Sequence, residues 1–212
     1  MGLCLRASHD ESIESVSNAF DRAYESLKAQ IRSGAFAAGQ HLDLVQLATA
    51  LGVSTSPVRE ALSALTGERM VQSIKGVGFH VPAFDYAAVA DLIKWSEYLS
   101  IMCVRTSRSD VPDIEFGVQA DHIARTEHLF LSIGRLARNQ EMTAALANAA
   151  LRLHQLHRLE PDFLADAADE VRRLEKAVEQ RSSALPHLLH AYHRRRTLAL
   201  PKIARQVRLS VR

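Results

Sequence analysis

The chain has 212 residues, of which 47% are hydrophobic, 24% charged and 6% aromatic, and its net charge is +2. This length suffices for one large domain or two small ones that each bury a core, and the composition excludes an intrinsically disordered protein. Because Ala and Leu are plentiful while aromatic residues are scarce, helices are favoured over sheets.

The sequence also predicts the cellular compartment of the protein. No apolar run reaches the roughly 18 residues that a membrane-spanning helix needs, and the first ten residues lack the apolar core of a secretory signal. The two cysteines, Cys4 and Cys103, build neither a disulfide framework nor a metal motif, so free thiols are predicted. We therefore expect a cytoplasmic protein with no membrane partner.

The first part of the chain is predicted to be helical after a loose start. Residues 1–16 are polar and are expected to form a flexible arm. Apolar residues recur at helical spacing over residues 16–32, and Gly34 then ends the helix. Asp43 is a predicted N-cap for a second helix that ends near Leu51.

The next segment reads as a tight turn followed by a third helix. The turn is Gly52-Val53-Ser54, and the helix after it ends near Gly67. Pro57 lies in the first turn of this helix, the place where a helix tolerates proline. Two short helices joined by a tight turn that contains glycine are typical of a helix-turn-helix.

A β-hairpin is predicted to follow these helices. Residues 70–74 and 78–81 read as short strands, and the turn between them is Lys75-Gly76-Val77. A helix-turn-helix with such a hairpin is a winged helix. Residues 17–84 are therefore predicted to form a winged helix-turn-helix domain.

The remainder of the chain, residues 85–212, is predicted to be an antiparallel helical bundle, so the fold class is mainly α. The expected helices are 85–107, 113–137, 140–158, 162–182 and 184–209. Asp85 and Asn139 are candidate N-caps. Pro161 and Pro186 lie where the first turns of later helices are expected.

An ordered set of residues in the winged helix carries a resemblance to a known family. The set is Tyr24, Leu27, Ile31, Gly34, Gly39, Leu42, Leu47-Ala48, Leu51-Gly52-Val53-Ser54, Pro57-Val58-Arg59-Glu60-Ala61-Leu62, Leu65, Val71, Gly76, Gly78-Phe79 and Val81. In this order and at this spacing, the segment resembles the DNA-binding domain of the GntR family of bacterial regulators. The resemblance implies a transcription regulator, not an enzyme, whose partner is a double-stranded DNA operator.

The resemblance also implies which residues contact DNA. A helix in the major groove presents its N-terminal residues to base edges, and a cation at a wing tip meets the negative potential of the minor groove. The predicted DNA-contacting residues are Arg32, Ser54, Thr55, Ser56, Arg59, Lys75 and Gly76. The family usually has Arg where this chain has Thr55, so the usual base preference is not expected to carry over.

Arg59, the function of the N-terminal domain and the function of the whole chain each have an alternative interpretation. Arg59 can instead form a solvated salt bridge with Glu60 or Glu68. Residues 1–84 hold seven Lys or Arg against eight Asp or Glu, so a winged helix that contacts only proteins is the alternative function. An enzyme is not expected, since the sequence has neither a glycine-rich phosphate loop nor a Gly-x-Ser-x-Gly nucleophile elbow.

An all-helical second domain of this length resembles the FadR subfamily, with its FCD-like or related C-terminal domain. The resemblance implies a repressor that forms a homodimer and binds a small-molecule effector within the helical domain. Many members also hold a metal ion through one Asp and three His. The corresponding positions here are Thr126, Phe130, Val171 and His193, of which only His193 matches. We therefore predict no metal and no other cofactor.

The expected effector is an anionic metabolite. Arginine and histidine side chains can meet its carboxylate, and two aromatic side chains can line the apolar side. The predicted effector-contacting residues are Trp95, Tyr98, Arg105, Arg125, His128, His154, His157 and His193. At their helical spacing, Trp95 and Tyr98 can alternatively belong to the core or to an interface.

Two groups of histidines lie at helical spacing. His154 and His157 form one group, and His187, His190 and His193 form the other. They can be interpreted as a rearranged metal-binding or acid-binding cluster, or as solvated histidines on helix surfaces. The second interpretation is favoured because Arg194-Arg195-Arg196 follows the later group directly, and these cations would repel a metal ion.

Overall fold

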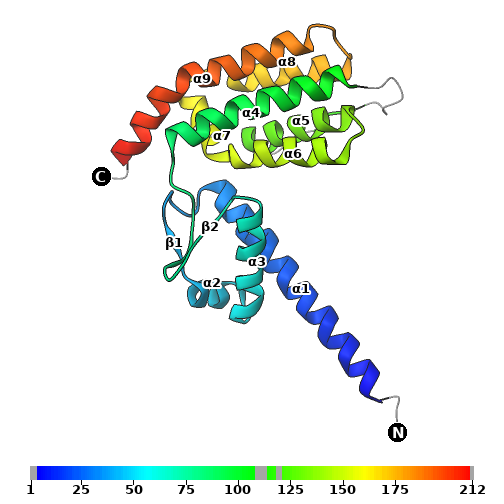
Figure 1. The fold of residues 1–212 in the computed structure, drawn as a ribbon, viewed down its shortest axis with the longest axis vertical. Helices are drawn as coiled ribbons and strands as arrows, with labels where there is room; N and C mark the ends of the chain where they lie inside the picture. The colour runs from blue at the N-terminus through cyan, green and yellow to red at the C-terminus, as the bar shows by residue number, and fades with distance from the viewer. Residues whose placement is uncertain (1–3, 108–113, 118–120, 211–212) are drawn as a thin grey trace. The chain divides into compact units, whose positions relative to one another are not determined.

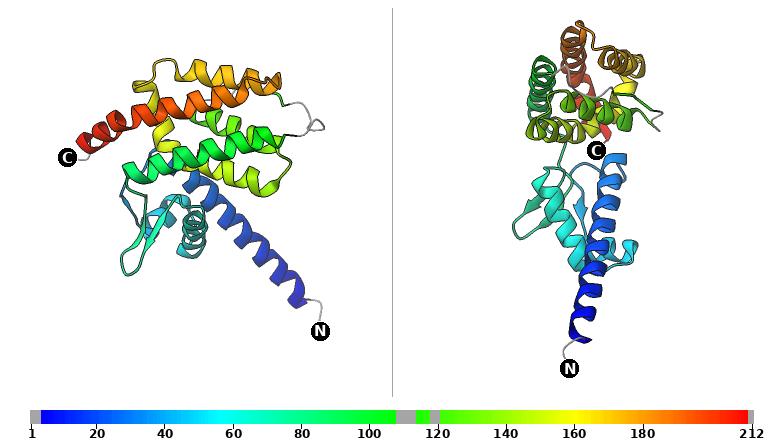
Figure 2. Two further views of the ribbon diagram at one scale, coloured as in Figure 1. Left: turned by 45° about the horizontal axis from the view of Figure 1, so that its top comes forward. Right: turned by 90° about the vertical axis from the view of Figure 1, so that its right-hand side faces the viewer.

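The computed structural model describes residues 4–107, 114–117 and 121–210, with side chains described between residues 18 and 207 of these ranges. The chain divides into two compact units, residues 1–83 and 84–212, each of which is described by itself (Figures 1 and 2). Among the described residues, no helix combines the length and the apolar character that crossing a lipid bilayer requires.

The N-terminal unit is a winged helix, as the sequence predicts. Its helices are α1 (Cys4–Ser33), α2 (Leu44–Leu51) and α3 (Thr55–Gly67), and its strands are β1 (His41–Leu42), β2 (Gln72–Ile74) and β3 (Gly78–His80). The strands form an antiparallel sheet in the order β1-β3-β2, in which Phe79 lies opposite Leu42 on one side and Ser73 on the other. Strand β1 was not predicted, because two residues are too few to display an alternating pattern.

The core of this unit forms where α1 packs against α3. Helix α1 buries Ala23, Leu27 and Ile31, which recur every fourth residue and so share one helix face. Helix α3 buries Val58, Ala61, Leu62 and Leu65. At the edge of this contact, Lys28 Nζ of α1 lies 3.0 Å from Glu68 Oε2, just beyond the end of α3.

Helix α1 is longer than the sequence predicts. It begins at Cys4 and so includes most of residues 1–16, the segment predicted as a flexible arm. That prediction rested on the missing apolar periodicity. The physical reason for the difference is that residues 4–33 contain neither glycine nor proline, the two residues that most strongly interrupt a helix.

The C-terminal unit is an antiparallel helical bundle (Figures 1 and 2). Its helices are α4 (Tyr86–Arg105), α5 (His122–Leu136), α6 (Gln140–Arg152), α7 (His154–Leu159), the 3-10 turn η1 (Glu160–Asp162), α8 (Ala167–Glu179) and α9 (Leu185–Ser210). Helices α4 and α9 run antiparallel: Ser96 meets His193 at 3.2 Å, and Glu97 meets His190 at 2.6 Å.

The predicted N-caps of the bundle are confirmed. Asp85 accepts a hydrogen bond from the Ala87 amide at the start of α4, and Asn139 accepts one from the Met142 amide at the start of α6. In both cases a short polar side chain satisfies an amide that the first turn of the helix leaves unpaired.

Three predicted helix boundaries in the bundle are wrong. Residues 114–117 belong to the predicted helix 113–137 but are not helical. Helix α5 begins at His122, and its N-cap Asp121 accepts a hydrogen bond from the Ala124 amide. The predicted helix 140–158 is split at Leu153 into α6 and α7. The predicted helix 162–182 starts at residue 167, because Glu160–Asp162 forms the separate turn η1.

The bundle buries two apolar clusters. The larger one includes Leu99, Phe130, Ile133 and Leu189, and the second includes Ile93 and Leu200 among others. Cys103 lies in the larger cluster and is fully buried. Burial raises the pKa of its thiol to about 11, so this cysteine is an unreactive core residue at neutral pH.

Candidate nucleic-acid interface and effector site

The turn between α2 and α3 positions the start of α3. Gly52 adopts a left-handed conformation with φ 66°, and its amide donates to the carbonyl oxygens of Ala48 and Thr49, which ends α2. Ser54 is the N-cap of α3, but its side chain makes no capping hydrogen bond. The Ser54 hydroxyl is therefore not committed to the helix terminus.

One face of α3 is buried and the other is open to solvent. Val58 and Ala61 point into the core with no exposed surface. Ser54, Thr55, Ser56 and Arg59, the four residues predicted to reach DNA from this helix, are all exposed. The structure thus brings these side chains together on the first turn and a half of a helix whose opposite side is fixed by packing.

The alternative partners predicted for Arg59 are engaged elsewhere. Glu68 accepts hydrogen bonds from Tyr24 and Lys28, and Glu60 accepts one from Ser56 at 3.2 Å. Within the described part of the chain, no ion pair is formed by the Arg59 guanidinium, so its charge faces solvent.

The residues of the wing that are predicted to contact DNA are also exposed to solvent. Lys75 and Gly76 lie in the turn between β2 and β3, and both are exposed. Gly76 has φ 78°, a left-handed conformation that glycine adopts without steric cost. Ile74 and Val77, on either side of these residues, are 45% and 57% exposed. Arg32, in the last turn of α1, is only half-buried and so retains solvent access.

Three of the predicted effector residues do not line an internal pocket. Trp95 and Tyr98 of α4 are 49% and 53% exposed, and Arg105 in the last turn of the same helix is also exposed. In this structure the two aromatic side chains therefore lie outside the interior of the bundle, and their role as effector contacts stays a prediction. The physical reason is that α4 turns Ile93 and Leu99 toward the core instead.

Two further predicted residues lie on α5 and already have partners. Arg125 forms a bidentate ion pair with Glu175 of α8, with Nε 2.9 Å from both carboxylate oxygens. His128 packs edge-on against Phe116, with ring centroids 5.5 Å apart. Both side chains are half-buried at the margin of the bundle.

The remaining predicted histidines lie inside the bundle. His154, His157 and His193 are 4%, 1% and 1% exposed, so the interpretation as solvated histidines is wrong for these three and holds only for His187 and His190, which are exposed. Burial lowers the pKa of His157 to about 4 and that of His193 to about 3, and both rings are neutral at physiological pH.

Sequence reasoning missed an ion-pair network that interacts electrostatically with His157 and His193. Arg196 of α9, with 1% of its side chain exposed, donates to Glu160 Oε1 at 3.0 Å and to Glu170 Oε2 at 2.6 Å. Its Nε lies 2.8 Å from Glu160 Oε2, a close ion pair without the alignment of a hydrogen bond. The guanidinium stacks over the Tyr192 ring at 3.3 Å, and His122 donates to Glu160 at 2.5 Å.

The network keeps its carboxylates ionised in the interior. Burial opposes ionisation of Glu160, but the hydrogen bond from His122 and the positive charge of Arg196 outweigh it and lower the pKa of Glu160 to about 2. Glu170 is paired with Arg196 and also with Arg195, whose Nη1 lies 3.0 Å from Glu170 Oε1. The buried positive and negative charges thus compensate one another.

A sequence signal for this network existed in α9. Buried residues recur there at Leu189, Tyr192, Leu200 and Ile203, and Arg196 continues the same spacing of three and four residues. An arginine within an apolar stripe requires a buried acidic partner. The signal is masked because Arg196 ends a run of three arginines, a pattern that is typical of a solvated patch.

The four positions that the FadR resemblance assigns to a metal do not fit one. Phe130 and Val171 carry no donor atom and are 1% and 0% exposed in the apolar core. Thr126 donates its hydroxyl to the His122 carbonyl oxygen at 2.8 Å. His193 uses Nδ1 toward the Leu189 carbonyl at 2.7 Å and Nε2 toward the Ser96 hydroxyl at 3.2 Å. Elsewhere in the described ranges, no group of three His, Cys, Asp or Glu side chains is arranged to bind a metal.

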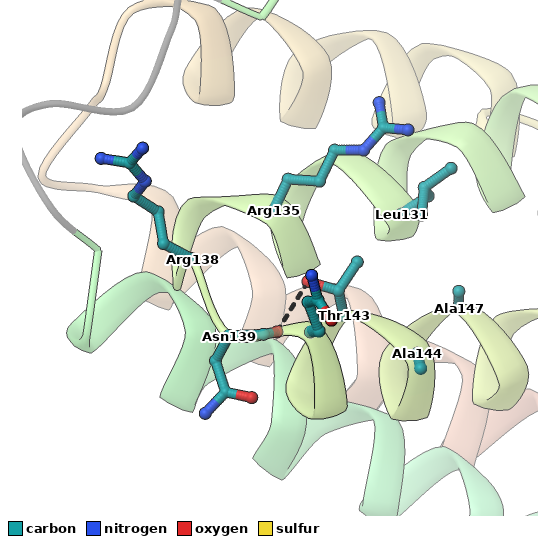
Figure 3. Close-up of a pocket in the computed structure, with 8 residues that line it drawn as sticks. Leu131, Arg135, Arg138, Asn139, Thr143, Ala144 and Ala147 are labelled. Atoms are coloured by element: carbon teal, nitrogen blue, oxygen red, sulfur yellow. Dashed lines mark hydrogen bonds between the residues drawn. The ribbon is translucent and has the colours of Figure 1, made fainter.

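A surface hollow of about 460 Å³ lies between the end of α5 and the start of α6 (Figure 3). None of the predicted effector residues lines it. Figure 3 shows Arg135 and Arg138 pointing in different directions from its rim. Asn139 and Thr143, its other labelled polar residues, are used within the helix terminus, where Thr143 Oγ1 donates to the Asn139 carbonyl oxygen at 2.9 Å. The hollow therefore offers no convergent set of polar groups.

Comparison with known proteins agrees with the winged-helix geometry. Residues 20–81 match the model of the bacterial regulatory proteins of the gntR family. The HTH-type transcriptional regulator YdhC of Bacillus subtilis is 27% identical over 104 residues, 49% of this chain and 46% of YdhC. The HTH-type transcriptional regulator BphR of Paraburkholderia xenovorans is 35% identical over 80 residues, 38% of this chain and 33% of BphR. The chain thus matches less than half the length of either relative.

The fold of most of the chain is also similar to that of a solved structure. E. coli McbR/YncC covers 87% of this chain and 97% of its own, with a TM-score of 0.61 and 20% sequence identity. At that identity the likeness concerns the fold, a winged helix followed by a helical domain. The similarity to the gntR family of bacterial regulatory proteins is carried by the matched segment, residues 20–81.

Proposed function

We propose that this chain is a ligand-responsive, DNA-binding transcription regulator that acts as a repressor controlled by a small anionic metabolite. The observation that carries the proposal is the exposed start of α3, where Ser54, Thr55, Ser56 and Arg59 face solvent in a domain that matches the gntR model. A helix with a buried back and a polar, exposed N-terminal turn fits the major groove of B-DNA.

The proposed mode of binding uses the exposed residues of α3, of the wing and of the end of α1. The α3 N-terminus reads base edges, Lys75 and Gly76 at the wing tip approach the minor groove, and Arg32 contacts a phosphate. A homodimer places two such readers on the half-sites of a pseudo-palindromic operator. The domain has few cations, so phosphate contacts are concentrated at these positions.

A binding titration tests the proposal. The purified chain is titrated against the DNA upstream of its own gene over a range of salt concentrations, with random-sequence DNA as competitor. Saturable, salt-sensitive binding that exceeds the competitor supports the regulator. Binding no better than competitor, both to this DNA and after selection from a random pool, contradicts it and favours a winged helix that contacts proteins.

Replacing Arg59 with alanine is expected to weaken operator binding by about 1–3 kcal/mol, the free energy of one well-placed arginine contact to a guanine. The loss should be larger on the operator than on random DNA, because base contacts carry specificity. Fluorescence anisotropy at constant salt measures both affinities. Arg172→Ala, at an exposed arginine of α8, is the matched control, and equal affinities for the two variants would remove Arg59 from the interface.

Replacing Lys75 with alanine is expected to weaken binding to every sequence by a similar factor. Losing one phosphate contact should also reduce the slope of log K against log salt by about 0.9. Titrations at several salt concentrations give this slope. Lys176→Ala, at an exposed lysine of α8, is the control. An unchanged slope for the Lys75 variant would show that the wing does not approach the phosphates.

The effector response is proposed to lie in the bundle, as in the FadR subfamily. His157 and His193 are buried and interact electrostatically with Arg196, whose guanidinium is held by Glu160 and Glu170. His154 is buried as well. A metabolite carboxylate would compete with these two carboxylates for the same cation and so shift the helices that carry them. Adding short aliphatic and aromatic carboxylates to the DNA complex tests this, and a complex that none of them releases would contradict repression relieved by an acid.

A further inference from the structure

Two histidines face each other across the three-stranded sheet of the N-terminal unit. His41 of β1 lies directly opposite His80 of β3 in the antiparallel register. Their ring centroids are 4.9 Å apart, and the ring planes meet at 64°. Directly opposite residues of antiparallel strands have Cβ atoms about 4.5–5.5 Å apart, so the backbone itself holds the two imidazoles side by side on one face of the sheet.

The core of the domain decides which face of the sheet carries this pair. The neighbouring residues Leu42 and Phe79 are 2% and 9% exposed and belong to the core. Because successive side chains of a strand point to opposite faces, His41 and His80 both point to the outer face. His41 is exposed there and His80 is half-buried, so an ion from solvent can reach the pair.

Gly78 makes room for the ring of His41. It lies two positions before His80 on β3 and therefore shares the outer face with it. A Cβ atom at Gly78 would lie 3.0 Å from His41 Nε2, tighter than ordinary van der Waals contact. The φ of Gly78 is 111°, a conformation that glycine adopts more readily than any other residue. The imidazole of His41 thus lies over bare backbone, beside His80.

The pair has coordinating nitrogens that no hydrogen bond uses. His80 Nδ1 is buried and has no hydrogen-bond partner, and within the described ranges the His41 ring makes no hydrogen bond either. A buried nitrogen without a partner is costly, and a bound ion removes that cost. Amide hydrogen bonds from Gln46 and Val45 lower the pKa of Asp43, and this carboxylate interacts electrostatically with His41, so the local charge favours a cation.

We propose that His41 and His80 form a binding site for a divalent transition-metal ion, with water in the remaining coordination positions. Imidazole nitrogen is a preferred ligand of Zn²⁺, Ni²⁺ and Cu²⁺. Two nitrogens bound to one tetrahedral ion at 2.0–2.1 Å lie about 3.3 Å apart, a separation that rings with centroids 4.9 Å apart reach by rotating about their side-chain torsions. The site shares no residue with the four positions that the FadR resemblance assigns to a metal.

The bound ion would connect the wing to the body of the domain. Strand β1 directly precedes α2, whereas β3 is the second strand of the hairpin. An unfolded chain does not hold residues 41 and 80 together, so the ion binds the folded domain preferentially and stabilises it. Binding is measured without DNA, so failure of this site and failure of the proposed regulator are distinguishable.

Calorimetric titration of the full chain with Zn²⁺ tests the site. The parent should bind one Zn²⁺ per chain in an event that His41→Gln and His80→Gln each weaken at least about tenfold, because each variant removes one of the two protein ligands. The matched control is His187→Gln with His190→Gln, at the exposed histidines of α9, which should leave this event unchanged. A parent that binds no Zn²⁺, or binding that either sheet variant retains at parent affinity, would overturn the proposal.

Nuclear magnetic resonance of the parent chain gives a readout that does not depend on how the variants fold. Added Zn²⁺ should shift the imidazole signals of His41 and His80 together and saturate at one equivalent, because both rings bind the same ion. The imidazole signals of the buried His157 and His193 should stay in place. Zn²⁺ that shifts the signal of only one ring of the pair, or of neither, would contradict a shared site.

Discussion

Replacing Arg196 with methionine is expected to lower the free energy of unfolding of the C-terminal unit by about 3–5 kcal/mol, which is the cost of breaking a buried ion pair from one side. Glu160 is fully buried and Glu170 is 7% exposed, so water cannot replace the lost guanidinium. The stacking of Arg196 on Tyr192 is lost as well. Urea unfolding followed by the fluorescence of Trp95, the single tryptophan of the chain, reports on this unit.

Two further variants separate the ion pair from general disruption of α9. Arg194→Met, at the exposed arginine two positions away, should change stability by no more than about 0.5 kcal/mol. Adding Glu160→Gln and Glu170→Gln to Arg196→Met should recover most of the loss, because the buried negative charges are then gone. If the single Arg196 variant is as stable as the Arg194 variant, the network does not stabilise the bundle.

The ion-pair network around Arg196 also limits how the bundle can respond to a metabolite that carries a carboxylate. The buried cation already has two carboxylate partners on different elements, Glu160 on η1 and Glu170 on α8. A metabolite carboxylate that displaces one of them leaves a buried glutamate without its partner, which is costly unless that element moves. The proposed effector response therefore links ligand binding to the position of η1 and α8.

The winged helix could be predicted from the sequence because its signals are local. Gly52 ends α2 in a left-handed conformation, and Gly76 lies in the hairpin turn with φ 78°. Asp43 caps α2 by accepting from the Val45 and Gln46 amides. Each of these interactions spans only a few residues, so residue type and spacing are sufficient to predict them.

The interior of the bundle could not be predicted in the same way. Arg196 finds Glu160 across 36 positions and Glu170 across 26, and no local pattern specifies which acidic residue a buried arginine meets. The break at Leu153 between α6 and α7 likewise interrupts a run that contains neither glycine nor proline. Local propensity favours a continuous helix there, and tertiary packing overrides it.

The effector residues are predicted from side-chain chemistry alone, and the structure places them in different environments. His154, His157 and His193 are indeed in the interior, whereas Trp95 and Tyr98 are on the outer face of α4. An aromatic residue at helical spacing has the same pattern whether it faces a core or a partner, so periodicity cannot distinguish the two. Whether such a residue faces the core or solvent depends on which other helices pack against that face.

The buried histidines predict how stability depends on pH. Burial lowers the pKa of His157 to about 4 and of His193 to about 3, whereas an unfolded chain titrates its histidines near the usual value of about 6.5. Between these values the unfolded state binds more protons than the folded state, so stability falls as pH falls. Glu160 contributes separately, because its pKa is lowered to about 2, and its stabilisation is lost only as pH falls below about 4.5.

Acidification from pH 6.5 to 4.5 is therefore expected to reduce the free energy of unfolding by up to about 1.4 kcal/mol per pH unit for each of the two histidines. Urea unfolding by Trp95 fluorescence at several pH values measures this slope. His193→Asn keeps a donor for the Leu189 carbonyl but cannot be protonated, so it should remove the contribution of one histidine from the slope, whatever its effect on absolute stability. His187→Asn, at an exposed histidine of the same helix, should leave the slope unchanged. If both variants keep the parent slope, His193 is not the buried neutral group that opposes protonation, and the acid sensitivity must arise from another part of the chain.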